Sequence, residues 1–201
     1  MSVVGSQTGH LLSESSSEPA SGPSRQTIRR LLSTALQAPS AYNRQPWKVR
    51  LRADGTLWFS VDHDRKLTYH DPEGRLALLS VGALVRLFLL AAEVEGWDGS
   101  ATLFPAVEDP EVIAAVRLDD RAPPTEQGRH LYPYVVKRRL VEGEFARTPV
   151  PDSVRHELRT VLDGMKEVRY ELVIDAHAKD GIAALIEAET LRRYENPAAC
   201  R

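Results

Sequence analysis

Residues 38–47, Ala-Pro-Ser-Ala-Tyr-Asn-Arg-Gln-Pro-Trp, concentrate side chains that can bind a ligand. Ser40 supplies a hydroxyl, and Asn43 and Gln45 supply amides that both donate and accept hydrogen bonds. The two prolines keep the backbone out of the helical region, so the segment is predicted to be a loop. A loop with these groups could hold a flat polar ligand. The alternative for Asn43 is a turn-capping bond to its own backbone, and the alternative for Trp47 is packing at the start of a strand.

The elements on either side of this loop follow from hydrophobic spacing and turn residues. Apolar residues recur every three or four positions over residues 25–37 and predict a helix, with Ser24 as its N-cap. Residues 48–51 and 57–61 predict two strands joined by a hairpin turn that contains Asp-Gly. The loop is thus expected between a helix and a strand.

Residues 74–96 carry the strongest helical pattern in the chain. Apolar side chains cover most of its circumference, which predicts a helix buried nearly all round. The small residues Ser80, Gly82 and Ala83 would let another backbone or a flat ligand approach closely. One small domain cannot cover so apolar a helix completely, and we therefore expect part of it to lie at an association surface.

The remaining chain alternates between predicted strands, helices and a loop. Strands are expected at 101–105, 112–118 and 169–174, a loop at 119–128, and helices at 129–139, 152–164 (capped by Asp152 or Ser153) and 180–194. This interleaving favours an α+β or three-layer α/β architecture. Residues 1–24 are rich in Ser, Gly and Pro and predict a disordered tail, which leaves residues 25–201 as one domain.

Composition narrows the classes of partner and the cellular location. A net charge of −2 over 201 residues gives no electrostatic reason to expect a nucleic-acid partner. Cys200 is the only cysteine, so neither an internal disulfide nor a cysteine-based zinc site is expected. No apolar run approaches the length needed to span a bilayer and the N-terminus has no signal pattern, so we expect a cytoplasmic protein without a membrane partner.

One group of titratable residues has the chemistry of metal ligands. His63 and His70 flank Asp62, Asp64 and Asp71, but their spacing matches no zinc pattern, and no metal is predicted. The chain also lacks a Gly-rich phosphate loop, a nucleophile elbow and a paired-carboxylate arrangement. No catalytic side chain is therefore assigned.

Three segments in order resemble the nitroreductase-like flavoproteins, and in particular their Acg-type branch. The loop matches the family form Ala-Pro-Ser-x-x-Asn-x-Gln-Pro-Trp at every defined position. The stretch Asp-Pro-Glu-Gly-Arg at 71–75 and the segment 136–151 are less specific matches, but their order and spacing agree. The resemblance covers residues 25–199. For Arg75, a surface ion pair with Asp71 or Glu73 is a simpler interpretation than a ligand-binding role.

The resemblance implies an α+β fold with a mixed sheet surrounded by helices, acting as a dimer with FMN between two units. It implies an FMN-dependent oxidoreductase that transfers hydride through flavin N5, with NAD(P)H as a candidate electron donor and a small organic or peptide-derived substrate. Carried over by position, Ser40 and Asn43 contact the ribityl chain and ring of the flavin, with support from Gln45. Arg138 and Arg139 of the other unit meet its phosphate, although a basic run after Lys137 can also be a solvated helix face.

The chain departs from this family in two respects. Acg-type members are usually about twice as long and pair two halves within one chain, so this chain is expected to pair with a second copy or another partner. Relatives read Arg-Arg-Ser/Thr-x-Arg where this chain reads Arg-Arg-Leu-Val-Glu at 138–142. An acid beside a phosphate opposes binding by about 1 kcal/mol or more near a protein surface. The alternative is therefore a non-catalytic relative that binds flavin or another ligand, or that acts as a partner-binding scaffold.

Overall fold

The computed structural model describes residues 12–13, 22–105, 109, 111–140, 143, 146, 148–164 and 168–195. The chain divides into two compact units, Met1–Arg139 and Leu140–Arg201. The boundary falls directly after Arg138 and Arg139, the pair that the family resemblance assigns to the flavin phosphate. Each unit is described by itself.

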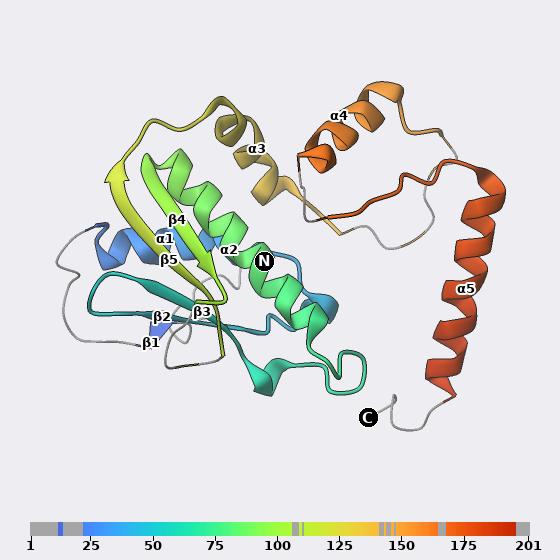
Figure 1. Cartoon of the computed structure of the whole chain (residues 1–201), viewed down its shortest axis with the longest axis horizontal. Coiled ribbons are helices and arrows are strands. Elements are labelled where there is room, and N and C mark those ends of the chain that lie inside the picture. The colour runs from blue at the N-terminus through green and yellow to red at the C-terminus, as the bar shows by residue number, and fades with distance from the viewer. Residues whose placement is uncertain are drawn as a thin grey trace. The chain divides into compact units, whose positions relative to one another are not determined.

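The first unit combines a mixed sheet with three helices (Figure 1). The strand order is β1-β2-β3-β5-β4, and only the β1–β2 pair is parallel. The strands are β1 (Leu12–Ser13), β2 (Trp47–Leu51), β3 (Leu57–Val61), β4 (Trp97–Leu103) and β5 (Val112–Arg121), and the helices are α1 (Arg25–Ala35), α2 (Arg75–Val94) and α3 (Glu126–Lys137). This confirms the predicted α+β class with a mixed sheet. Strand β1 falls inside the segment predicted to be a disordered tail, where Leu12 pairs with Val49.

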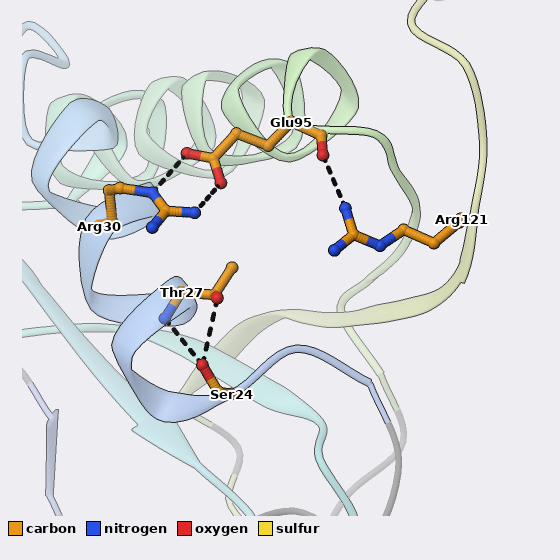
Figure 2. A network of polar contacts seen from close by, with 5 residues as sticks. All are labelled: Ser24, Thr27, Arg30, Glu95 and Arg121. Carbon is orange, nitrogen blue, oxygen red and sulfur yellow. Dashed lines mark hydrogen bonds and ion pairs between the residues drawn. The ribbon is translucent and has the colours of Figure 1, made fainter.

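Helix α1 begins where the sequence predicts. The Ser24 hydroxyl accepts a hydrogen bond from the Thr27 backbone N–H at 3.2 Å, which satisfies one of the free donors of the first turn (Figure 2). At the surface, Arg30 Nε donates to Glu95 Oε1 at 2.9 Å, and this carboxylate raises the pKa of Arg30. Arg121 Nη1 donates to the Glu95 carbonyl at 2.9 Å. Figure 2 shows that Glu95 thereby ties α1 to the end of β5.

The β2–β3 hairpin has the predicted turn. Asp54 Oδ1 accepts a hydrogen bond from the Thr56 N–H at 3.0 Å, and Gly55 has φ +83°, a value that glycine adopts without strain. That hydrogen bond lowers the pKa of Asp54. On the inner face, Phe59 of β3 lies 5.5 Å from Phe88 of α2, centroid to centroid, in the middle of the core.

Helix α2 forms the centre of the first unit but is not buried all round. Ala77, Val81, Leu84 and Phe88 pack into the core, whereas one face that includes Leu79, 70% exposed, is open. The prediction of burial around the whole circumference is wrong for this face. A single small sheet covers only the opposite side of the helix.

By length and composition, α2 could also cross a membrane, which differs from the expectation that no apolar run is long enough. Its apolar window has a mean hydropathy of 2.0, and half of that window is buried inside the protein. Core helices of soluble proteins have the same properties, and in this unit α2 contacts β2, β3, β4 and β5.

Helix α3 begins three residues earlier than the sequence predicts because Thr125 caps it. The Thr125 hydroxyl accepts from the Gly128 N–H at 3.0 Å and donates to Glu93 Oε1 of α2 at 2.5 Å. Gly128 permits this close approach, since a Cβ atom there would lie 2.4 Å from Glu93 Oε1. The short contact fixes the start of α3 against the end of α2.

The second unit contains α4 (Asp152–Asp163) and α5 (Ala176–Tyr194). Pro151, rather than Asp152 or Ser153, is the N-cap of α4. Residues 169–174 form no strand, in contrast to the prediction, and no described segment of this unit offers a strand to pair with them. Val154, Leu158 and Val161 recur on one side of α4 and are exposed, so the second unit leaves an apolar helix face uncovered.

Candidate functional site

The loop at 38–47 has an unusual backbone conformation. Tyr42, Asn43 and Gln45 all have φ +51°, in the left-handed region that non-glycine residues seldom adopt. Each such residue costs about 1–2 kcal/mol relative to an ordinary conformation, with asparagine the most tolerant. Strain of this kind persists where surrounding contacts hold it and is concentrated at ligand-binding sites. The loop is therefore a strained segment held in one shape.

Hydrogen bonds link the three loop residues that the sequence selected. Ser40 Oγ accepts from the Gln45 backbone N–H at 3.0 Å, and Gln45 Nε2 donates to Asn43 Oδ1 at 3.4 Å. The Ser40 carbonyl accepts from the Asn43 N–H at 3.0 Å and closes the turn between them. Trp47 follows at 2% exposure and anchors the end of the loop in the core, as its packing interpretation predicts. Ser40, Asn43 and Gln45 thus form one connected set.

Arg138 lies next to this loop within the same unit, whereas the family resemblance implies that the loop and the arginines reach one flavin from two different units. It is the C-cap of α3, and its Nη2 donates to the Gln37 carbonyl at 2.8 Å, immediately before the loop begins. A guanidinium has five N–H donors, so this bond leaves others for a ligand. Arg138 and the loop residues can therefore serve one site.

Arg139 does not turn toward the loop. Its Nη1 donates to the carbonyls of Val136 and Arg138 at 2.9 and 3.1 Å, which are the end of its own helix. Leu140, where relatives carry a hydroxyl, is exposed at the start of the second unit. Glu142, the acid predicted to oppose phosphate binding, lies outside the described residues.

A shallow pocket opens beside the loop, with a volume of about 190 Å³ that includes its open mouth. Loop residues, the segment after β3 and the first turns of α2 form its wall. It is lined by Ala41, Arg44, Pro46, Arg65, Lys66, Leu67, Asp71, Leu76, Ala77 and Ser80. Of its basic side chains, Arg44 lies 21 positions before Arg65, which is followed directly by Lys66. Local sequence patterns do not indicate this site, because only the folding of the β2–β3 hairpin brings Arg44 to Arg65, where Arg44 Nε donates to the Arg65 carbonyl at 3.3 Å.

Two aromatic contacts place His70 beside the loop. Tyr42 is 73% exposed, and its ring centroid lies 5.4 Å from that of His70. His70 also meets Tyr69 edge to face at 5.3 Å. These rings offer an exposed aromatic surface next to the amides of the loop.

The other sequence candidates have structural partners. Arg75 forms an ion pair with Glu73 at the surface, as predicted. His63 pairs with Glu111 rather than with a second histidine. In the part of the chain that the structure describes, no three His, Cys, Asp or Glu side chains are grouped so that they could hold a metal ion.

Comparison with known proteins gives two informative relatives. The chain is 31% identical over 169 residues to a protein of Mycobacterium tuberculosis named "Putative NAD(P)H nitroreductase acg", a match that covers 84% of this chain and 50% of the relative. It is 30% identical over 171 residues to "Putative NAD(P)H nitroreductase Rv3131" of the same species, covering 79% of this chain and 49% of that protein. The chain spans about half the length of the curated relatives it matches. No protein-family model matches it.

Solved structures of similar shape have lower identity. A structure described as a "putative nitroreductase in complex with FMN" from Desulfovibrio desulfuricans aligns with a TM-score of 0.40 at 19% identity, over 64% of this chain and 90% of that one. A nitroreductase family protein from Clostridium difficile 630 aligns with a TM-score of 0.43 at 16% identity, over 86% of this chain and all of that one.

The sequence matches confirm the resemblance that the loop motif indicates. Over most of its length, this chain is similar to the nitroreductase-like proteins. Among them, it is similar to Acg and its mycobacterial relative.

Proposed function

We propose that this chain is one subunit of an FMN-dependent oxidoreductase that uses NAD(P)H as electron donor and acts on a small organic or peptide-derived substrate in the cytoplasm. The main observation that supports this proposal is that the strained 38–47 loop and Arg138 lie close together. The Arg138 guanidinium lies 2.8 Å from the carbonyl of Gln37, the residue before the loop. The names of the two mycobacterial relatives support the same reaction class.

The residues present fit a flavin by their chemistry. Ser40, Asn43 and Gln45 carry the donors and acceptors that match the polar edge of an isoalloxazine ring and the ribityl hydroxyls. Arg138 supplies a guanidinium suited to a phosphate, with Arg139 as a second candidate after a change of side-chain conformation. When bound, the flavin supplies hydride chemistry at N5, so the protein contributes binding and orientation rather than a nucleophile.

We assign the open face of α2 to association with a second copy of this chain or with a partner chain. Leu79 is exposed on this face, and at Gly82 an added Cβ would meet no atom within 4 Å, so another backbone has room to approach. Exposed apolar patches of this kind mark association surfaces.

A second candidate function is a non-catalytic flavin- or ligand-binding protein, or a scaffold for a partner. It is favoured by Arg139, which bonds to its own helix end, and by Leu140 in place of the hydroxyl. Such a protein could retain FMN through the loop and Arg138 without reacting with NAD(P)H.

The test is an FMN titration followed by anaerobic addition of NADH or NADPH. The proposal predicts bound flavin in the visible spectrum and bleaching on reduction, with weaker binding in Asn43→Ala and Arg138→Gln. Arg117→Gln is the control, since that exposed arginine pairs with Asp119 on its own strand. Bound FMN that NAD(P)H never bleaches would favour the second candidate, and an absence of bound FMN would refute the first.

A further inference from the structure

The pocket beside the loop combines three cationic side chains with little opposing charge. Arg44 comes from the loop, and Arg65 and Lys66 come from the segment after β3. In the part of the chain that the structure describes, neither Arg44 nor Lys66 forms an ion pair. Arg44 Nε donates to the Arg65 carbonyl at 3.3 Å, and Lys66 Nζ donates to the Pro72 carbonyl at 2.8 Å. Their charges are therefore not neutralised by these contacts.

Two carboxylates, those of Asp71 and Asp62, offset part of this positive charge. Asp71 also lines the pocket, but its side chain is buried, and its Oδ2 accepts from the Ala77 N–H at 2.9 Å. Asp62 lies 2.8 Å from Lys48 Nζ and 3.7 Å from Arg65 Nε, so it only partly offsets the charge of Arg65. The pocket therefore keeps an excess of positive charge.

Lys66 lies at the start of α2, where the Asp71 carboxylate, through its bond to the Ala77 N–H, is a negative group at the same helix end. The lysine crosses the start of α2, where an added Cβ on Gly74 would lie 3.2 Å from Lys66 Cε and 3.3 Å from its Nζ. The N-terminus of a helix carries partial positive charge and disfavours a neighbouring cation. The first turn of α2 contains no acidic residue. A bound anion would interact favourably with the ammonium group and with the helix end together.

We propose that this pocket binds one oxyanion, the phosphate or carboxylate group of a small molecule, between Arg44, Arg65 and Lys66. Its volume includes open solvent, so the pocket is a shallow surface depression that suits a single charged group rather than a whole ligand. The same pocket is lined by Ala41 and Pro46 of the loop, which places the rest of that molecule beside Asn43 and Tyr42. Arg138 is not among the residues that line this pocket.

The test measures binding of inorganic phosphate to the full chain by NMR or calorimetric titration. The buffer has low ionic strength and adds no anion that competes with phosphate. Lys66→Gln and Arg44→Gln should each weaken phosphate binding by at least about tenfold, as expected for loss of a charge-assisted hydrogen bond. Arg75→Gln is the matched control because it removes a positive charge at the same helix end from a side chain paired with Glu73 outside the pocket. Thermal melts of all variants establish that they are folded.

A competition experiment identifies the source of the oxyanion. Phosphate that competes with FMN but not with riboflavin would show that the pocket takes the flavin's own phosphate group. Phosphate that binds at the pocket without competing with either flavin would assign it to another ligand, and both outcomes support the site. Absence of phosphate binding, or equal affinity in the wild type, Lys66→Gln and Arg44→Gln, would overturn it. Failure to bind either flavin would refute the proposed function but leave the phosphate result intact.

Discussion

Replacing Ser40 with alanine tests whether the loop is held in a strained shape by a small number of hydrogen bonds. Ser40 Oγ is the side-chain acceptor for the Gln45 N–H, at 3.0 Å in a half-buried position. The substitution leaves that N–H without this acceptor, and a buried unsatisfied donor costs about 1–3 kcal/mol. Because the N–H is only half-buried, we expect a cost near the lower end of that range.

Because the loop is strained, we expect the substitution to promote local opening of the loop rather than unfolding of the whole unit. Tyr42, Asn43 and Gln45 relax from φ +51° when the loop opens, so strain lowers the free energy of opening in both proteins, and the lost hydrogen bond sets the difference between them. A local destabilisation of 1–2 kcal/mol corresponds to a change of about 5–30-fold in the opening equilibrium. Hydrogen exchange at the Gln45 amide should accelerate by that factor, whereas core amides in β3 should exchange at unchanged rates.

Ser33→Ala is the matched control for this prediction. Ser33 Oγ donates to the Arg29 carbonyl within α1 at 2.9 Å, so its loss removes a serine hydrogen bond without leaving a backbone N–H unsatisfied. Alanine also favours a helix more than serine does. If Ser40→Ala leaves exchange at Gln45 unchanged, or if Ser33→Ala accelerates it equally, the account of the loop as a held, strained segment is wrong.

Three further predictions concern association, packing and pH. Leu79→Lys should lower the sedimentation mass from dimer to monomer with an unchanged melting temperature, because Leu79 is 70% exposed; a dimer that persists would remove α2 as the interface. Gly128→Ala should destabilise the first unit in urea denaturation, since its Cβ would lie 2.4 Å from Glu93 Oε1; unchanged stability would mean that Glu93 moves aside freely. Asp54 has a pKa lowered from 3.8 by the Thr56 N–H, so its stabilising effect is present above about pH 4 and is lost as pH falls through the folded-state value. In urea titrations, Asp54→Asn should therefore lose less free energy of unfolding than the wild type between about pH 5 and about pH 3. An equal loss in both proteins would contradict the assignment of this pH dependence to Asp54.

Local signals in the sequence were sufficient for the elements that position the loop. Ser24 as N-cap, the Asp-Gly hairpin and Trp47 at the start of β2 depend on neighbouring residues, and each has its predicted place in the structure. The loop motif also selected Ser40, Asn43 and Gln45, which the structure links by hydrogen bonds.

Features that depend on distant contacts could not be predicted in this way. The open face of α2 reflects how much of the helix the sheet covers, which apolar periodicity does not determine. The pattern at 169–174 suits a strand, but a strand requires a partner, and the described part of its unit provides none. The pocket between Arg44 and Lys66 exists only because the intervening hairpin returns the chain to the loop.

The central claim is that the loop and Arg138 bind a flavin, and a visible absorbance spectrum of the purified protein incubated with FMN and then desalted tests it most directly. Our account predicts that flavin bands remain with the wild-type protein, diminish in Asn43→Ala and Arg138→Gln, and bleach when NADH or NADPH is added without oxygen. A folded wild-type protein that stays colourless after this incubation would contradict the account.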